Sequence, residues 1–500
     1  MANLGSLVKD TAIYGLSSII GRFLNYLLVP LYTAQLAAAS GGYGVITNVY
    51  AYTALFMVLL TYGMETTFFR FANKQEEDGG KVYSTVLTAV ATTSTLFVVL
   101  VLSLLGWIAP AMGYGDHPDY VGVMAVVVAL DAFQCIPFAY LRHKHRPIKF
   151  ATLKLTFIFL NIALNLLYYW LLPKLYVSHP EVVGRIYDPA VGAGYAFYIN
   201  LVCTSLITFG FWKELTGFKW QFDWSLMKRM LSYSWPILVL GIAGILNQTA
   251  DKILFPFIYP GSDGHAQLGI YGAATKIAMI MALITQAFRY AYEPFVFGKA
   301  SERDNRDTYA RAMKFFIVFT LLAFLAVMAW IDVLKHIIAP DYWEGLRVVP
   351  IVMVAEIMMG IYFNLSFWYK LIDRTIWGAW FSGAGCAVLI ATNVLLVPHF
   401  GYMACAWAGV AGYGTAMLLS YFVGQRYYPI AYPLRDITLY VVLTAVLTAM
   451  AMLPPIANPW LATAYRTIFV ILFAAFIVRH EHLAPMLQRL PVVGRLFKRK

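Results

Sequence analysis

The sequence predicts an all-α polytopic membrane protein with about fourteen transmembrane helices, and three observations lead to this class. Hydrophobic residues make up 61% of the 500 residues and charged residues 12%, whereas soluble domains are about 45–50% apolar and about 25% charged. Apolar runs of about 20 residues, the length that spans a bilayer, recur along the chain. Lysine and arginine gather in every second connection between these runs. The composition argues against a soluble enzyme, a disordered protein and a nucleic-acid binder.

Fourteen apolar runs follow one another along the chain, and each is long enough for about one membrane crossing. They are centred on residues 12–35, 44–68, 83–108, 120–141, 150–172, 190–212, 231–256, 268–296, 312–337, 347–369, 375–397, 401–424, 436–453 and 460–478. Prolines lie inside runs at Pro30, Pro137, Pro236 and Pro350. A membrane helix tolerates proline when neighbouring groups satisfy the freed carbonyl, so these positions are candidate kinks.

A cleavable secretory signal is the alternative interpretation of the N-terminus, because residues 37–39 are three alanines that resemble a cleavage site. The apolar stretch before them is longer than the core of a signal peptide, which has about 7–15 residues. It also contains Arg22, Asn25 and Pro30. We therefore expect the first helix to be retained.

The distribution of lysine and arginine predicts the orientation, because positive residues gather in cytoplasmic loops. With the N-terminus inside, the inside segments carry about 27 Lys and Arg residues and the outside loops about four. One missed or added span would destroy this alternation. We predict an inner (cell) membrane protein with both termini in the cytoplasm. The net charge of +12 then faces anionic lipid, and the basic tail, 481–500, lies on the inner leaflet.

An internal repeat predicts the domain organisation. Tyr43–Gly44 opens the second predicted helix and Glu65 follows 22 residues after Tyr43; Tyr271–Gly272 opens the eighth, and Glu293 follows 22 residues after Tyr271. Two copies of six helices each have the same orientation in the membrane, which is the parallel-repeat plan of alternating-access carriers. The predicted domains are the N-terminal lobe 1–215, the C-terminal lobe 216–428, two additional transmembrane helices over 429–480, and the tail.

Cations inside the predicted spans define a candidate substrate site, because charge in hydrocarbon is costly and indicates function. Arg22 lies roughly 18 Å deep at 1.5 Å per residue, and Asn25 lies one turn further on the same face. Lys252, Lys276 and Arg289 lie in the seventh and eighth predicted helices. A cationic pocket suits a phosphate-bearing ligand. The alternatives are a structural ion pair for Arg22 and snorkelling to the interface for the two lysines.

Three acidic residues, Glu65, Glu293 and Asp131, are candidates for ion coupling or gating. Glu293 lies one turn after Arg289, so a structural ion pair between these two is the alternative. Glu65 lies near the inner end of its span, where an interfacial position costs little. Asp131 either lines a cavity or neutralises Arg22.

No catalytic or cofactor motif is present. The phosphate-binding GxxxxGK[ST] pattern, GxSxG and HExxH do not occur. The cysteines lie far apart inside apolar runs, without a CxxC spacing, so neither a disulfide nor a zinc site is supported. They are Cys135, Cys203, Cys386 and Cys405. We therefore expect no cofactor, no metal and no enzymatic activity.

The N-terminal segments KDTAIYGLSSIIGRFLNYLLVPLYTAQL, GYGV and LLTYGMETTFFRFANKQ resemble the opening of the Wzx-type O-antigen flippases. These form the polysaccharide-exporter branch of the multidrug/oligosaccharidyl-lipid/polysaccharide (MOP) superfamily. The resemblance extends through the fourteen spans and the two six-helix halves. It implies a two-lobed carrier with a central cationic cavity and a polyprenyl-pyrophosphate-linked oligosaccharide as substrate. The lipid II flippase group uses arginines in helices one and eight, and Arg22 and Arg289 fit that pattern here.

The expected function is therefore the transfer of a lipid-linked glycan from the inner to the outer leaflet, with H+ or Na+ as candidate coupling cation. Rocking of the two halves would use Pro30 and Pro236 as candidate hinges. Membrane lipid and polysaccharide-assembly proteins are the expected partners. A cation-coupled multidrug antiporter of the same superfamily is the first alternative. A polytopic glycan polymerase or glycosyltransferase is the second, and the short loops leave little room for its catalytic groups.

Overall fold

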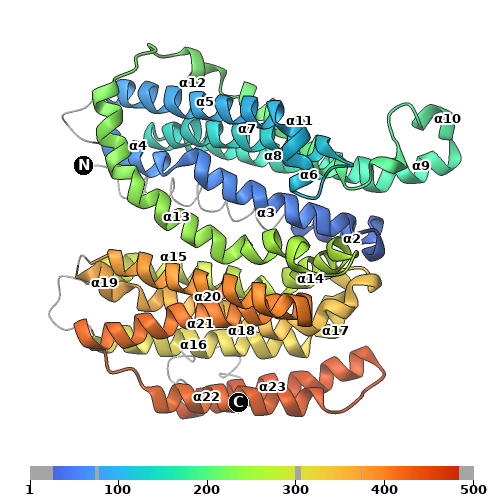
Figure 1. The fold of residues 1–500 in the computed structure, drawn as a ribbon. Helices are drawn as coiled ribbons and strands as arrows, with labels where there is room; N and C mark the ends of the chain where they lie inside the picture. Colours follow the sequence, from blue (N-terminus) through green and yellow to red (C-terminus); the bar gives the residue numbers. More distant parts are fainter. Residues whose placement is uncertain (1–25, 74–77, 299–305, 373, 483–500) are drawn as a thin grey trace. The chain divides into compact units, whose positions relative to one another are not determined.

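The computed structural model describes residues 26–73, 78–298, 306–372 and 374–482, with the backbone alone over 290–298. Regular structure in these ranges is helical, without a strand (Figure 1). This confirms the predicted all-α class. Arg22, Asn25 and the tail from residue 483 lie outside the described residues.

The described helices follow the predicted spans in order. Eleven are long and apolar enough to cross a membrane, and Gly264–Ala278 with Ile280–Arg289 forms one further bent span. Gly194–Phe209 is a shorter apolar helix at the sixth predicted position. Together they account for thirteen of the fourteen predicted runs, and the first run, 12–35, lies mostly outside the described residues.

The described chain divides into two compact units, and the first comprises residues up to 273 together with 389–405. Its helices are α2 (Leu28–Gln35), α3 (Gly42–Thr61), α4 (Met64–Ala72), α5 (Gly79–Ser103), α6 (Leu105–Ala111), α7 (Pro118–His143), α8 (Pro147–Leu166), α9 (Leu172–Ser178), α10 (Pro180–Val183), α11 (Gly194–Phe209), α12 (Trp212–Thr216) and α13 (Trp224–Ile258). A π-helical segment, Leu167–Leu171, joins α8 to α9. Helices α9 and α10 extend beyond the other helices of this unit (Figure 1).

The second unit comprises residues 274–388 and 406–500. It begins within α14 (Gly264–Ala278) and contains α15 (Ile280–Gly298), α16 (Arg306–Ala329), α17 (Ile331–Leu334), α18 (Val349–Leu365), α19 (Phe367–Leu371), most of α20 (Ile376–Phe400) and α21 (Tyr402–Tyr427), α22 (Leu434–Met452) and α23 (Pro459–His480).

Local sequence signals set several helix starts. Proline occupies the first turn of α7, α8, α18 and α23, where its missing N–H costs no helical hydrogen bond. Asp223 caps α13 by accepting a hydrogen bond from the Leu226 amide at 3.0 Å, as expected for an aspartate at this position. Pro137 and Pro236 lie inside α7 and α13 without ending them. The bend of 43° lies instead between α14 and α15, away from the predicted prolines.

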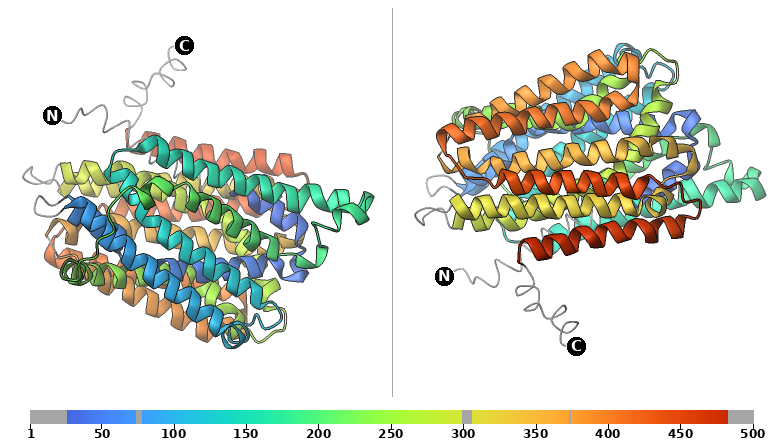
Figure 2. Two further views of the ribbon diagram at one scale, coloured as in Figure 1. Left: turned by 90° about the horizontal axis from the view of Figure 1, so that it is seen from above. Right: turned by 90° about the horizontal axis from the view of Figure 1, so that it is seen from below.

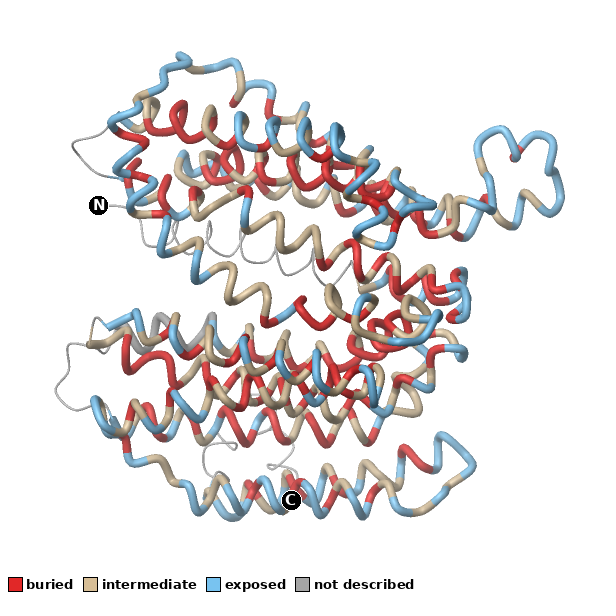
Figure 3. Tube along the Cα trace, viewed as in Figure 1, coloured by how far each residue is buried: buried red, intermediate tan, exposed pale blue. Residues whose placement is uncertain are grey.

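The core of the first unit joins helices from both sequence repeats. Met64, Phe68, Tyr83 and Met230 are buried together, on α4, α5 and α13. Helix α7 is the most buried of the candidate spans (Figure 3). Helix α13 opens the predicted C-terminal lobe by sequence, yet it packs into the first unit. The predicted lobe boundary at 215/216 is based on the sequence repeat and not on packing. It stays a prediction.

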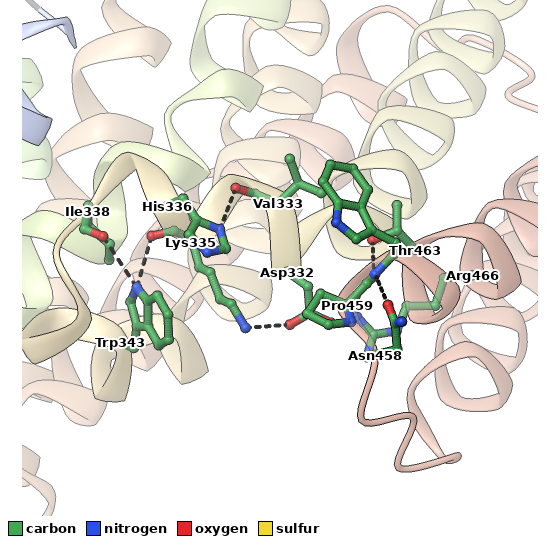
Figure 4. Close-up of polar contacts among 11 residues, drawn as sticks. Asp332, Val333, Lys335, His336, Ile338, Trp343, Asn458, Pro459, Thr463 and Arg466 are labelled. Atoms are coloured by element: carbon green, nitrogen blue, oxygen red, sulfur yellow. Dashed lines mark hydrogen bonds and ion pairs between the residues drawn. The ribbon is translucent and has the colours of Figure 1, made fainter.

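The two additional helices, α22 and α23, pack against α16 (Figure 2). Ion pairs fasten them at both ends of α16. Just beyond the end of α16, Asp332 of α17 accepts a hydrogen bond from Arg466 of α23 at 2.7 Å and one from Lys335 at 3.0 Å (Figure 4). Near its start, Lys314 lies 2.5 Å from Glu481. Arg466 is therefore a structural ion-pair partner in the second unit.

The segment between the two sequence repeats is docked on the first unit. Glu214 is 3% exposed and pairs with Lys149 and with Arg146 at the start of α8. The Tyr83 hydroxyl donates to the Glu214 carbonyl at 3.0 Å, and Lys81 pairs with Asp223 at 2.6 Å. These contacts hold the connection from α12 to α13 against α5 and α8.

Candidate functional site

The predicted substrate-site cations that the structure describes lie on α13, α14 and α15. Lys252 belongs to the first unit, whereas Lys276 and Arg289 belong to the second. Lys276 is half-buried and Arg289 is exposed. The Arg289 guanidinium lies 5.0 Å from the ring centroid of Phe363. This cation–π contact orients the side chain, and the guanidinium itself is planar, with its N–H donors in one plane.

Lys252 is held in a local ion pair. Its ammonium lies 2.9 Å from both carboxylate oxygens of Asp251 and 2.9 Å from the Gln248 carbonyl oxygen. Asp251 is buried and also accepts a hydrogen bond from the Tyr271 hydroxyl at 2.7 Å. The charge of Lys252 is therefore balanced within its own helix, which fits the structural alternative as well as a ligand role.

Glu65, a predicted coupling residue, is engaged at the start of α4. Its carboxylate pairs with Arg142 near the end of α7 and accepts a hydrogen bond from the Cys135 thiol at 3.1 Å. The Arg142 guanidinium also lies 4.8 Å from the centroid of the Phe69 ring. This pair connects α4 to α7 inside the first unit. The side chain of Glu293 lies outside the described residues.

Asp131 belongs to a polar network that crosses the interior of the first unit. The Thr204 hydroxyl of α11 donates to the Asp131 carboxylate of α7 at 3.3 Å. The same hydroxyl lies 3.4 Å from the Asn200 amide oxygen, and the Asn200 amide donates to the Tyr50 hydroxyl of α3 at 3.0 Å. In the described part of the chain no cation forms an ion pair with Asp131. The charge of Lys154 on α8 acts on Asp131 without a direct ion pair, whereas Glu65 is paired directly with Arg142.

The partners of Asp131 are uncharged, so a search for charge in apolar runs does not reveal them. Asn200, Thr204 and Thr208 recur every four residues on α11, which places them on one helix face. Gln134 of α7 donates to the Thr204 carbonyl at 2.9 Å and to the Thr208 hydroxyl at 2.8 Å. This periodic polar stripe in an apolar helix was the available signal.

Asn48 is a second residue that charge-based reasoning did not find. It is 1% exposed, and its amide donates to the Lys252 carbonyl oxygen of α13 at 2.7 Å. Its amide oxygen accepts a hydrogen bond from the Tyr114 hydroxyl at 2.6 Å. Asn48 thereby ties α3 to α13 and to the connection before α7.

Comparison with known proteins gives one family match and several structural ones. The family model described as "Polysaccharide biosynthesis protein" matches residues 7–289, which is more than half of the chain. No curated protein sequence matches significantly.

The fold is similar to those of solved MOP-superfamily proteins. A structure titled "Lipid II flippase MurJ, inward closed conformation" has a TM-score of 0.71 at 13% identity, covering 95% of this chain and 99% of that one. An inward-facing multidrug resistance MATE family transporter has a TM-score of 0.59 at 14% identity, covering 83% and 97%. The MATE multidrug transporter DinF-BH has a TM-score of 0.58 at 18% identity, covering 83% and 95%.

Proposed function

Because the chain belongs to the polysaccharide biosynthesis protein family, we propose that it is a flippase for surface polysaccharide assembly. It moves a polyprenyl-pyrophosphate-linked oligosaccharide from the inner to the outer leaflet by alternating access. The family match over residues 7–289 carries this proposal. The MOP-superfamily fold, shared with a lipid II flippase, supports it, and so does the parallel repeat, which is typical of carriers with a site between their halves.

The proposed substrate site uses cations to hold the pyrophosphate. Arg22 and Arg289 supply planar guanidinium groups for paired hydrogen bonds to phosphate oxygens, and Asn25 supplies an amide donor. Lys276 adds a point charge. Lys252 adds one only if substrate phosphate competes with Asp251, because the structure pairs these two side chains.

The proposed coupling residue is Asp131. A carboxylate that has a hydrogen-bond donor but no direct ion-pair partner among the described residues is suited to exchange a proton or bind a monovalent cation during transport. The Asp131–Thr204 contact at 3.3 Å supplies such a setting. Glu65 and Glu293 remain further candidates, and the Glu65–Arg142 pair makes gating the more suitable role for Glu65. Exchange at these positions would couple transport to H+ or Na+.

A deletion strain complemented with variants tests the substrate site. We expect the deletion to accumulate polyprenyl-pyrophosphate-linked glycan and lose surface polymer, and the wild-type gene to restore both. Arg22→Ala and Arg289→Ala should insert normally but fail to restore the polymer, because each removes a phosphate-binding guanidinium. Arg185→Ala, at an exposed position after α10, is the matched control and should be active. A fully active Arg22→Ala variant would refute the pyrophosphate site.

The same strain distinguishes the antiporter. Unchanged lipid-linked glycan together with altered retention of lipophilic cations would assign the chain to multidrug extrusion. The proposed location is the inner membrane with both termini in the cytoplasm. Polysaccharide-assembly proteins are the proposed partners, and their co-purification with the complemented protein would test that part.

A further inference from the structure

Two glycines that occupy equivalent positions in the sequence repeat meet at one helix crossing in the first unit. Gly44 lies in the first turn of α3, and Gly272 lies in α14. A Cβ atom on Gly44 would lie 1.7 Å from the His265 carbonyl oxygen and 2.9 Å from the Gly269 amide nitrogen. A Cβ atom on Gly272 would lie 2.6 Å from the Thr47 hydroxyl. At position 44 only glycine permits this approach, because a Cβ there would meet backbone, whereas a Cβ at position 272 would meet only the Thr47 side chain.

Buried polar contacts lie beside the glycine crossing on the same pair of segments. Asn48, one turn after Gly44, reaches the Lys252 carbonyl and the Tyr114 hydroxyl. Tyr271, which precedes Gly272, is buried and donates to Asp251. The crossing is therefore closely packed, and Asn48, Tyr271 and Asp251 beside it each have a defined hydrogen-bond partner.

The crossing lies at the end of the unit where α13 stops at Ile258 and α14 starts at Gly264. The predicted topology places this end at the outer face. We propose that the Gly44–Gly272 crossing is the outer gate of the transporter, closed in this structure, and that it separates when the outer side opens. This inference rests on the proposed alternating-access function. It explains why both copies of the repeat carry Tyr–Gly at the same position: each copy supplies one half of the gate.

A static packing contact is the competing explanation, and a reversible cross-link separates the two. Thr47 Cβ lies 3.3 Å from the position of a Cβ on Gly272, close to the roughly 3.5–4.5 Å separation of disulfide-bonded pairs. The double variant Thr47→Cys/Gly272→Cys, made without the four native cysteines, should form a disulfide across the closed crossing.

Oxidation of this double variant should stop transport of the lipid-linked glycan, and a reductant should restore it. Each single-cysteine variant is the matched control and should be insensitive to the oxidant. A cross-linked protein that still transports would overturn the proposal, because a gate has to open in every cycle. Failure of the folded double variant to cross-link would overturn it as well, because the two positions would then not meet.

A second experiment uses no substrate. Ala51→Cys reports on the closed gate, because Ala51 is 4% exposed and lies on α3 two turns deeper than Gly44. Gly44→Ala should raise its labelling rate by an impermeant maleimide applied from outside by about tenfold or more, since the new methyl group meets backbone that cannot rotate away. Gly244→Ala on α13 is the control, because a Cβ there has no neighbour within 4 Å.

Equal protection of Ala51→Cys in the Gly44→Ala and parent proteins would overturn the gate. The outcomes also separate the gate from the proposed function. If the Ala51→Cys labelling behaves as expected but deletion of the gene leaves the lipid-linked glycan unchanged, the gate is retained and the flippase is refuted. Glycan transport that needs Arg22 but continues through the cross-link retains the flippase and refutes the gate.

Discussion

The ion pair between Lys314 and Glu481 should stabilise the attachment of the additional helices to α16. The two side chains are 14% and 10% exposed and 2.5 Å apart, so they are neither fully buried nor free in water. Breaking a buried pair costs about 3–5 kcal/mol, and an exposed pair contributes about 0–1 kcal/mol. Because Tyr440 still donates to Glu481, we expect Lys314→Met to lower the unfolding free energy by about 2–3 kcal/mol.

The double variant Lys314→Met/Glu481→Gln should recover most of this loss, because the only carboxylate among the described residues that is left without its cation is that of the more exposed Asp436, 3.9 Å from Lys314 in the parent. The unfolding free energy in mixed micelles with increasing SDS measures all four members of the cycle. Lys228→Met, at an exposed position on α13, should change it by less than about 0.5 kcal/mol. A cycle in which Lys314→Met matches the wild type, or in which the two changes add without coupling, would refute the reasoning.

Three further predictions concern Asn48, the pH dependence of the Glu481 contact, and Glu214. Asn48→Ala should lower the unfolding free energy by about 2–4 kcal/mol, since it leaves two buried hydrogen-bond partners unpaired, whereas Tyr114→Phe should lower it by about 1 kcal/mol. The same SDS titration measures both losses, and equal losses would contradict this prediction. Burial raises the pKa of Glu481, but hydrogen bonds from Lys314 and Tyr440 and the charge of Lys314 outweigh it and lower the pKa. Its stabilisation is therefore full above the usual carboxyl pKa and lost as pH falls through the lowered one, and Glu481→Gln should lack this acid-side decline. Glu214→Gln should free the connection before α13, visible as faster tryptic cleavage there; unchanged cleavage would show that its ion pairs are dispensable.

Hydropathy and charge alone determined the fold class. Each apolar run is a local property, because a helix in lipid satisfies its own backbone groups. Thirteen predicted runs therefore reappear as helices in the same order. The bend between α14 and α15 could not be read from proline positions, because no proline lies there and packing decides where a helix breaks.

The residues of the candidate site also divide into those that the sequence predicts and those that only the tertiary structure brings together. Arg289 and Asp131 were predicted from sequence because charge in an apolar run is conspicuous, and the family resemblance suggested the substrate class; both stay predictions. The sequence also showed the repeated Tyr–Gly. Only the tertiary structure showed that Gly44 and Gly272 face each other's helices and that the Asn48 amide reaches the Lys252 carbonyl oxygen. Those facts depend on which helices approach within a few ångströms, and close approach is a property of packing between segments over 200 residues apart that no local pattern encodes.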